Sequence, residues 1–162
     1  MAQADFFLKI DGVEGESDDD THAKEIQLSS FSFGVANSGS GGWGGGSGAS
    51  KANVQDLHFT KLLDKSSPNL FQACCTGKHF DTATVTIRKA GGDSPVEYLI
   101  YNLSEVFVSS FTVSGHDGGG IAQESGSLNF SKVEMTYNPQ TAEGGADAAN
   151  TKGYDIKANK PF

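Results

Sequence analysis

Short segments in which apolar and polar residues alternate constrain the fold of this chain more than any other feature. The clearest is ATVTIRK (83–89), where every second residue up to Ile87 is apolar. A period of two is typical of a β-strand with one buried face. The residues expected to face inward are Ala83, Val85 and Ile87, and those expected to face outward are Thr84, Thr86 and Arg88. Related patterns occur at 5–10, 25–33, 96–103, 105–113, 127–137 and 154–157, so the chain is predicted to be mainly β.

Two of these segments change the face that they bury. In 127–137 the apolar positions shift from even to odd numbers after Phe130, which predicts a β-bulge near Ser131–Lys132. A similar shift follows Leu28 in the segment 25–33. Strands that change face suit a barrel or a bent two-sheet sandwich better than a flat sheet.

One helix is predicted among the strands. Ser67 is a suitable N-cap, Pro68 suits the first helical position, and Gly77 supplies a C-terminal stop. The apolar side chains on its expected buried face are Leu70, Phe71 and Cys74. Cys74 is therefore interpreted as a small core residue rather than a reactive thiol. The preceding segment, 53–63, fits neither the helical nor the strand period.

Length and charge exclude several classes of protein. The 162 residues suit one domain, 1–162, and no domain boundary or internal repeat is visible. The net charge of −8 argues against nucleic-acid binding and against attachment to anionic membranes, both of which need clustered Lys and Arg.

The start of the chain and its cysteines indicate where it folds. No signal-peptide pattern and no apolar stretch long enough to span a membrane occur in the sequence, so no membrane insertion is expected. Cys74 and Cys75 are adjacent, which is not the spacing of a disulfide framework or a metal site. The protein is expected to fold in a reducing cytoplasm.

A glycine-rich stretch, 38–50 (SGSGGWGGGSGAS), contains the only tryptophan, Trp43. Gly39, Gly41 and Gly44 have the spacing of a dinucleotide-binding motif, but a run so rich in glycine matches that pattern by chance. No helix is predicted after it to present its N-terminus to a phosphate. The stretch is predicted to be a long loop between two strands, and 142–153 a second loop.

No enzyme is predicted. The histidines at 22, 58, 79 and 116 do not have zinc-motif spacing, and no nucleophile motif accompanies them. The pairs His79–Asp81 and His116–Asp117 are interpreted as loop residues. The acidic run 14–20 lacks the glycine and final glutamate of a calcium loop and is expected to be a solvated turn. No catalytic, metal or cofactor residue is proposed.

Several segments resemble the haemolysin-coregulated proteins (Hcp), the tube subunits of bacterial type VI secretion. The specific stretches are KANVQDLHFTKLLDKSSPNL (51–70) and GKHFDTATVTIRKAG (77–91). FLKIDGVEGES, VEYLIYNLSEVFVSS and LNFSKVEMTY also match, and the similarity runs in order from about residue 5 to the end. The stretches 38–50 and 142–153 are where members of the family differ most.

The resemblance implies a compact β-barrel of two sheets with one flanking α-helix. It implies that six copies form a ring, that rings stack head to tail into a hollow tube, and that a contractile sheath expels the tube behind a spike protein. Effector proteins would be carried in the lumen. The expected localisation is synthesis in the bacterial cytoplasm without a signal peptide, followed by secretion into the medium or a target cell.

Two positions are singled out as sites. In 25–33, Phe31 and Phe33 are expected to point into the core, and Ser30 and Ser32 in the opposite direction. The resemblance suggests that this strand lines the ring, so Ser32 is predicted to contact cargo, with a plain solvent-facing serine as the alternative. Trp43 is predicted to pack against an adjacent subunit or the next ring, with packing on its own barrel as the alternative.

Two other functions stay open. One is a monomeric ligand- or carbohydrate-binding β-sandwich with the glycine loop at its binding rim. The other is a tube subunit fused to an enzyme or toxin domain, for which no room is expected after the last strand. Native mass separates the first of these from a ring.

Overall fold

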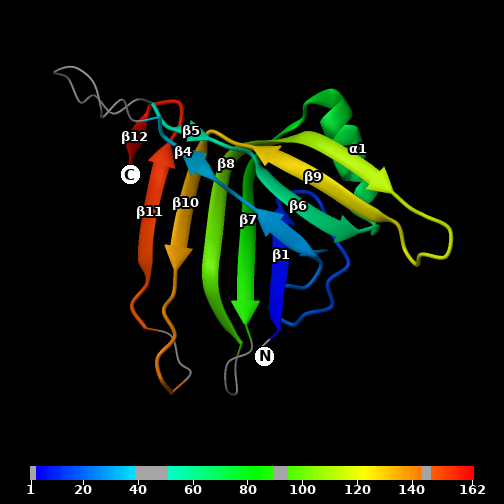
Figure 1. The fold of residues 1–162 in the computed structure, drawn as a ribbon, viewed down its shortest axis with the longest axis horizontal. Coiled ribbons are helices and arrows are strands. Elements are labelled where there is room, and N and C mark those ends of the chain that lie inside the picture. The colour runs from blue at the N-terminus through cyan, green and yellow to red at the C-terminus, as the bar shows by residue number, and fades with distance from the viewer. Residues whose placement is uncertain (1–2, 39–50, 90–94, 144–146) are drawn as a thin grey trace.

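The computed structural model describes residues 3–38, 51–89, 95–143 and 147–162. They form a mainly β structure with one helix, as predicted (Figure 1). The elements are β1 (Ala4–Ile10), β2 (Ile26–Leu28), β3 (Ser30–Ser32), β4 (Val35–Ala36), β5 (Asn53–Val54), β6 (Leu57–Leu62), α1 (Ser67–Thr76), β7 (His79–Lys89), β8 (Val96–Ser114), β9 (Gln123–Asn129), β10 (Lys132–Tyr137), β11 (Asn150–Asp155) and β12 (Lys160–Pro161).

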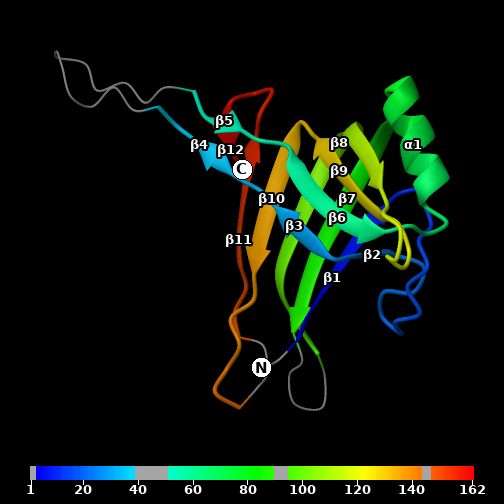
Figure 2. The ribbon, with the colours of Figure 1, turned by 45° about the vertical axis from the view of Figure 1, so that its right-hand side comes forward.

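The strands form two layers that share β8. The first layer has the order β12-β11-β10-β8-β7-β1-β2, and the second contains β3, β6, β9 and the C-terminal half of β8. In the view of Figure 2, β3, β6 and β9 cross in front of the first layer. The long strand β8 joins the layers because it pairs with β10 over Leu99–Ser104 and with β9 over Phe107–Ser114.

At both positions where the sequence predicted a change of buried face, the chain crosses from one layer to the other. Strand β9 ends at Asn129 in the second layer and β10 begins at Lys132 in the first, so the predicted bulge is a junction between separate strands. In the same way, β2 pairs with β1 while β3 pairs with β6. Ser29 lies between them, and its N–H donates to the carbonyl of Thr60. The two changes of buried face were therefore predicted correctly, and the bulge was not.

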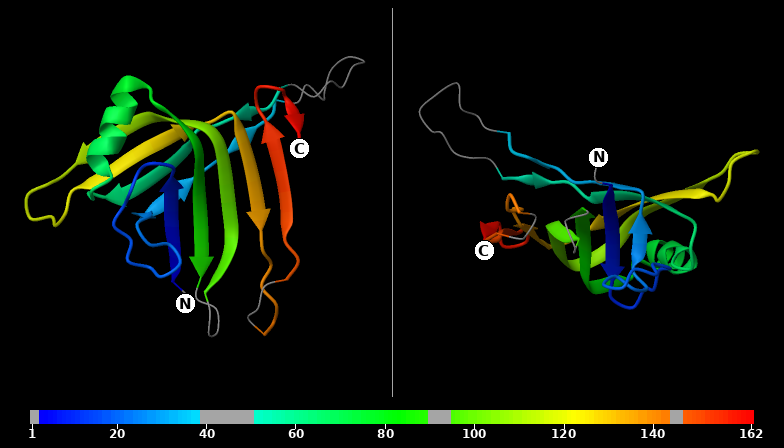
Figure 3. Two further views of the ribbon diagram at one scale, coloured as in Figure 1. Left: turned by 180° about the vertical axis from the view of Figure 1, so that it is seen from behind. Right: turned by 90° about the horizontal axis from the view of Figure 1, so that it is seen from below.

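The expected closed barrel is not formed by the strand ladders. Among the described strands, the second layer ends at β3 and the first ends at β2, and these two are consecutive pieces of chain rather than paired neighbours. Because only Ser29 separates β2 from β3, the chain has no room for the turn that would place them side by side. The observed architecture is two layers packed over one core, with α1 against the C-terminal half of β8 (Figure 3).

The core lies between the layers and follows the alternation of the strands. Ala83, Val85 and Ile87 are buried as predicted. Phe31 and Phe33 pack against this core, where both rings contact Tyr101. Their inward orientation was also predicted correctly.

Toward the C-terminal end of β7 the opposite face is buried as well, at Thr86 and Arg88, which the alternation did not predict. Arg88 is only 7% exposed, because the β1–β2 connection covers it. Its guanidinium donates to Asp19 over 2.9 Å and also contacts Asp5. The acidic run 14–20 is therefore not simply a solvated turn: Asp19 lies against the sheet.

His22 holds the other end of the same connection. It is buried, its ring stacks on Phe7 with 4.4 Å between centroids, and its two nitrogens lie 2.6 and 2.7 Å from Glu25 and Glu97. These contacts explain how a loop rich in acidic residues packs on the outer face of the first layer.

The helix begins one residue earlier than its predicted cap implies. Ser66 is the N-cap and Ser67 the first helical residue, while Gly77 ends the helix in the left-handed conformation with φ 66°, as predicted. Leu70 is buried, but Cys74 is half-buried and Phe71 is exposed. The predicted apolar face is thus only partly covered. In the C-terminal region β11 begins at Asn150, so the expected loop 142–153 is partly strand.

Candidate functional site

The outward side of the second layer carries two rows of polar residues, all of them Ser or Thr except His58. Strand registers place the first row as Ser32, His58, Ser127 and Ser110, and the second as Ser30, Thr60, Ser125 and Thr112. We call these eight residues the hydroxyl face. All are exposed except Ser127. Most of them line a shallow hollow of about 160 Å³.

The hydroxyl groups on this face bind one another. Ser30 Oγ lies 2.6 Å from Thr60 Oγ1, and Ser110 Oγ lies 2.5 Å from Ser127 Oγ. A register shift next to Val108 brings Ser109 beside this pair, 2.7 Å from Ser127 Oγ. Ser109 also donates to Asp56 at the margin of the face, again over 2.7 Å. A hydroxyl both donates and accepts, so each can also bind an incoming polar group.

The charged residues of the same strands point the other way. Lys61 on β6 and Glu124 on β9 are paired across the ladder, with 2.7 Å between Nζ and Oε2, and both side chains are fully buried. Ser67 at the start of α1 donates to the same Glu124 oxygen over 2.9 Å. Lys61 also donates to Asp64 over 2.9 Å and to Ser67 over 3.1 Å. This network attaches the beginning of the helix to the inner side of the second layer.

Of the two predicted site residues, one is described by the structure. Ser32 is exposed on β3, on the side opposite Phe31, and belongs to the hydroxyl face. Trp43 lies outside the described residues. The strands that flank the glycine-rich stretch, β4 and β5, pair with each other as an antiparallel hairpin.

Sequence reasoning missed the rest of the face. The positions that it did not identify are His58, Thr60, Ser110, Thr112, Ser125 and Ser127. In 57–62 the alternation is regular, with Leu57 and Phe59 buried and His58 and Thr60 exposed. Lys61 is the next buried residue after Leu57 and Phe59. Because it is charged, the apolar alternation seemed to stop there, and the strand was not recognised from the sequence.

The other candidates for chemistry do not come together. Within the ranges that the structure describes, no group of three or more His, Cys, Asp or Glu side chains could hold a metal ion. His79 begins β7 rather than lying in a loop, and its ring contacts Phe107. In the same described ranges, no helix is long and apolar enough to cross a membrane.

Comparisons with known proteins support a structural role rather than a catalytic one. The family model described as "Type VI secretion system effector, Hcp" matches residues 7–137. The chain belongs to the Hcp family of type VI secretion proteins, which are secreted and are not enzymes.

Individual relatives cover nearly the whole chain. Protein hcp1 of Pseudomonas aeruginosa is 52% identical over 156 residues, which are 96% of each protein. The crystal structure of Hcp1 from Salmonella typhimurium is 40% identical with a TM-score of 0.80, and each chain is covered completely. A solved structure of a type six secretion system protein has a TM-score of 0.93 at 32% identity, covering 99% of this chain and 100% of the other.

Proposed function

We propose that this chain is the subunit of a type VI secretion inner tube, in which six copies form a ring and rings stack head to tail. A contractile sheath would expel the tube behind its spike protein. Effector proteins would travel in the lumen, against the hydroxyl face. Assembly would begin in the bacterial cytoplasm and end with secretion.

The observation that carries this proposal is a layer with two open edges. Within the described residues, β3 pairs only with β6, and residues 108–114 of β8 pair only with β9. Open strand edges expose unpaired N–H and C=O groups that another chain can satisfy. Since the two edges differ and lie at opposite ends of the layer, contacts between them would be head to tail, and such contacts form a ring when the rotation from one copy to the next closes.

Exposed apolar side chains near both edges support the same arrangement. Val35 beside β3 is 56% exposed, and Val113 on β8 is 51% exposed. Val35, Val54 and Met135 line an apolar groove of about 330 Å³. Figures 1 and 3 show the β4–β5 hairpin and α1 at opposite ends of the molecule. Burial of such residues would stabilise a contact between neighbouring copies.

Light scattering on the purified protein tests the ring. We expect a mass of six times 17.0 kDa for the parent chain. Val35→Lys and Val113→Lys should each lower the assembled fraction and leave circular dichroism unchanged. Leu62→Lys is the matched control, because Leu62 is 46% exposed but lies on the central strand β6. A parent protein that stays monomeric at all concentrations would contradict the ring and favour a monomeric binding protein.

Cargo contact at Ser32 has its own test. Ser32→Gln adds bulk to the hydroxyl face without changing a charge or an inward side chain. We expect intact rings that retain less effector protein during purification. Effector retention equal to that of the parent would contradict a role for Ser32.

A further inference from the structure

The chain contains two Asp-Gly pairs, Asp11–Gly12 and Asp117–Gly118. Both pairs occupy the central positions of a β-turn of the same kind. In each turn the N–H of the last residue donates to the carbonyl of the first, over 3.0 Å in turn 10–13 and 3.2 Å in turn 116–119. The two glycines also have nearly equal φ angles, 84° and 82°. The local geometry therefore does not distinguish the two aspartates.

An Asp-Gly pair rearranges without an enzyme. The amide nitrogen of the glycine attacks Cγ of the protonated aspartate carboxyl, a C–N bond forms, and the carboxyl hydroxyl leaves with the N–H proton as water. The product is a cyclic imide, succinimide. Water then adds to one of its carbonyl carbons, and the C–N bond at that carbon breaks. When the broken bond is the one to the original main-chain carbonyl, the chain stays linked through the side chain, as isoaspartate. Glycine favours the attack because no side chain shields its nitrogen.

Turn 10–13 is held in place by the fold. The attack requires the aspartate backbone to rotate until Cγ meets the next nitrogen, so an anchored turn must first open. The end residues of this turn, Ile10 and Val13, are buried, and the Asp11 N–H donates to the carbonyl of Thr82 over 3.4 Å. Rotation at Asp11 would therefore disturb the core and the contact with β7.

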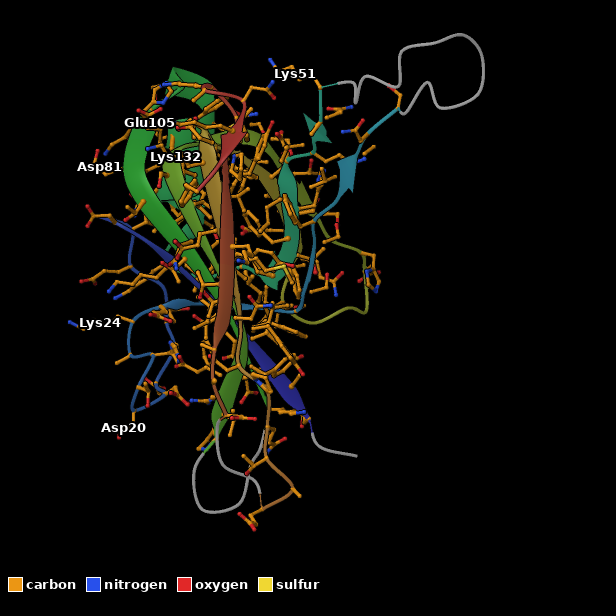
Figure 4. All side chains as sticks on the ribbon, turned by 90° about the vertical axis from the view of Figure 1, so that its left-hand side faces the viewer. Asp20, Lys24, Lys51, Asp81, Glu105 and Lys132 are labelled. Atoms are coloured by element: carbon orange, nitrogen blue, oxygen red, sulfur yellow. The ribbon has the colours of Figure 1, made fainter. Side chains whose placement is uncertain are left out.

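Turn 116–119 has no such anchor. Residues 115–121 are all exposed, and among the residues that the structure describes, the bond that closes the turn is the only hydrogen bond that they make. Figure 3 shows the β8–β9 hairpin extending beyond the layers, and in Figure 4 it lies on the side of the molecule opposite Asp20 and Lys24. Three consecutive glycines, 118–120, leave the backbone after Asp117 free to rotate.

We propose that Asp117 is a site of spontaneous isoaspartate formation in the folded protein, and that the fold protects Asp11 from the same reaction. The change inserts the side-chain methylene of Asp117 into the backbone of the turn. It alters the tip of the β8–β9 hairpin and leaves the mass and the net charge of the chain unchanged. The proposal concerns a single subunit and does not rest on the proposed function.

Incubation of the purified chain at neutral pH in water enriched in heavy oxygen tests the proposal. Each passage through the succinimide incorporates one heavy oxygen atom, and mass spectrometry of peptides cut after Lys and Glu separates the two turns and identifies isoaspartate. We expect label and isoaspartate to accumulate at Asp117 at least about tenfold faster than at Asp11, because Asp11 reacts only after local opening. In urea both turns are released from the fold, and the two rates should agree within about threefold.

A pair of glycine variants controls for the chemistry. Nothing lies within 4 Å of a Cβ atom added to Gly118 or Gly120. Gly118→Ala should lower the rate at Asp117, because its methyl group shields the reacting nitrogen, whereas Gly120→Ala should leave that rate unchanged. Circular dichroism confirms that each sample stays folded. The absence of label at Asp117, equal rates at the two aspartates in the folded chain, or a ratio of rates that is the same in urea would each overturn the proposal.

Discussion

At the scale of single residues, charged side chains in buried positions hold the parts of this protein together. Lys61 and Glu124 fix the start of α1 to β6 and β9, and Arg88 with Asp19 fixes the β1–β2 connection to β7. Each pair joins segments far apart in the sequence. Removing one partner therefore affects more than a local contact.

Lys61→Met should lower the free energy of unfolding by about 3–5 kcal/mol, because it leaves the Glu124 carboxylate buried without its ion-pair partner. The double variant Lys61→Met, Glu124→Leu should recover part of that loss, since the fully buried carboxylate is gone while Asp64 still lacks Lys61. Urea denaturation followed by circular dichroism measures both. Lys65→Met is the control, because Lys65 pairs with Glu14 at the surface and should change stability by less than about 1 kcal/mol. Equal losses in the single and double variants would contradict this account.

The environment of Asp19 predicts how the stability of the fold depends on pH. Its hydrogen bond with Arg88 holds the pKa of this carboxyl well below its ordinary value of 3.8. A pKa that is lower in the folded state means that the contribution to stability is complete above the ordinary value and is lost as pH falls below it. We expect the Tm to fall on acidification below about pH 4, and to fall less steeply in Asp19→Asn. Asp18→Asn, which changes an exposed neighbour, should keep the slope of the parent.

At the scale of elements, close approach between strands depends on one glycine in β9. Gly126 is paired with Phe59 on β6 and Phe111 on β8. A Cβ atom on Gly126 would lie 2.6 Å from the ring of Phe59, which is itself buried in the core. The second layer thus has no room for a side chain at this position.

Gly126→Ala should destabilise the fold by about 1–3 kcal/mol, because Phe59 must leave its packed position. Combination with Phe59→Leu should cost less than the sum of the two single changes, since the smaller side chain makes space. Gly120→Ala is the control, because nothing lies within 4 Å of its added Cβ atom. Thermal denaturation measures all four variants, and a neutral Gly126→Ala would contradict the steric argument.

At the scale of the whole molecule, the two layers have different outer faces. The first layer is covered on part of its outer face by the β1–β2 connection, where Arg88 and His22 are buried. Among the described strands, the second layer leaves the hydroxyl face and its two strand edges open. A subunit with one covered face and open edges is suited to assembly with copies of itself.

Trp43 provides a test of that assembly, since it is the only tryptophan and its fluorescence reports on one site. We expect emission typical of a solvated indole in isolated rings, and a shift to the blue when tubes form, because packing against a neighbour would remove the ring from water. Trp43→Ala should slow tube assembly. Emission typical of a buried indole in both states, or unchanged assembly of Trp43→Ala, would contradict this prediction.

The sequence by itself determined most of the elements and part of the site. Alternation in 83–89 and 25–33 correctly oriented Val85, Phe31 and Ser32, because a strand's side chains alternate whatever packs against it. Gly77 marked the helix end because few other residues adopt its left-handed backbone. The lack of metal or catalytic spacing, together with the resemblance to Hcp, was sufficient to argue against an enzyme.

Only the tertiary structure decided where the layers meet and which polar residues are buried. The chain crosses from one layer to the other at Ser29 and just before Lys132, and both crossings depend on pairing with distant strands. In the sequence they are visible only as a change in the buried face. Arg88 looked exposed because its cover, Asp19, comes from a loop 69 residues away. β6 was not recognised because Lys61 occupies one of its inward positions, and the residue that makes this burial possible, Glu124, lies on another strand. Local periodicity predicts which side chains share a face, whereas the burial of that face is set by whichever distant segment packs on it.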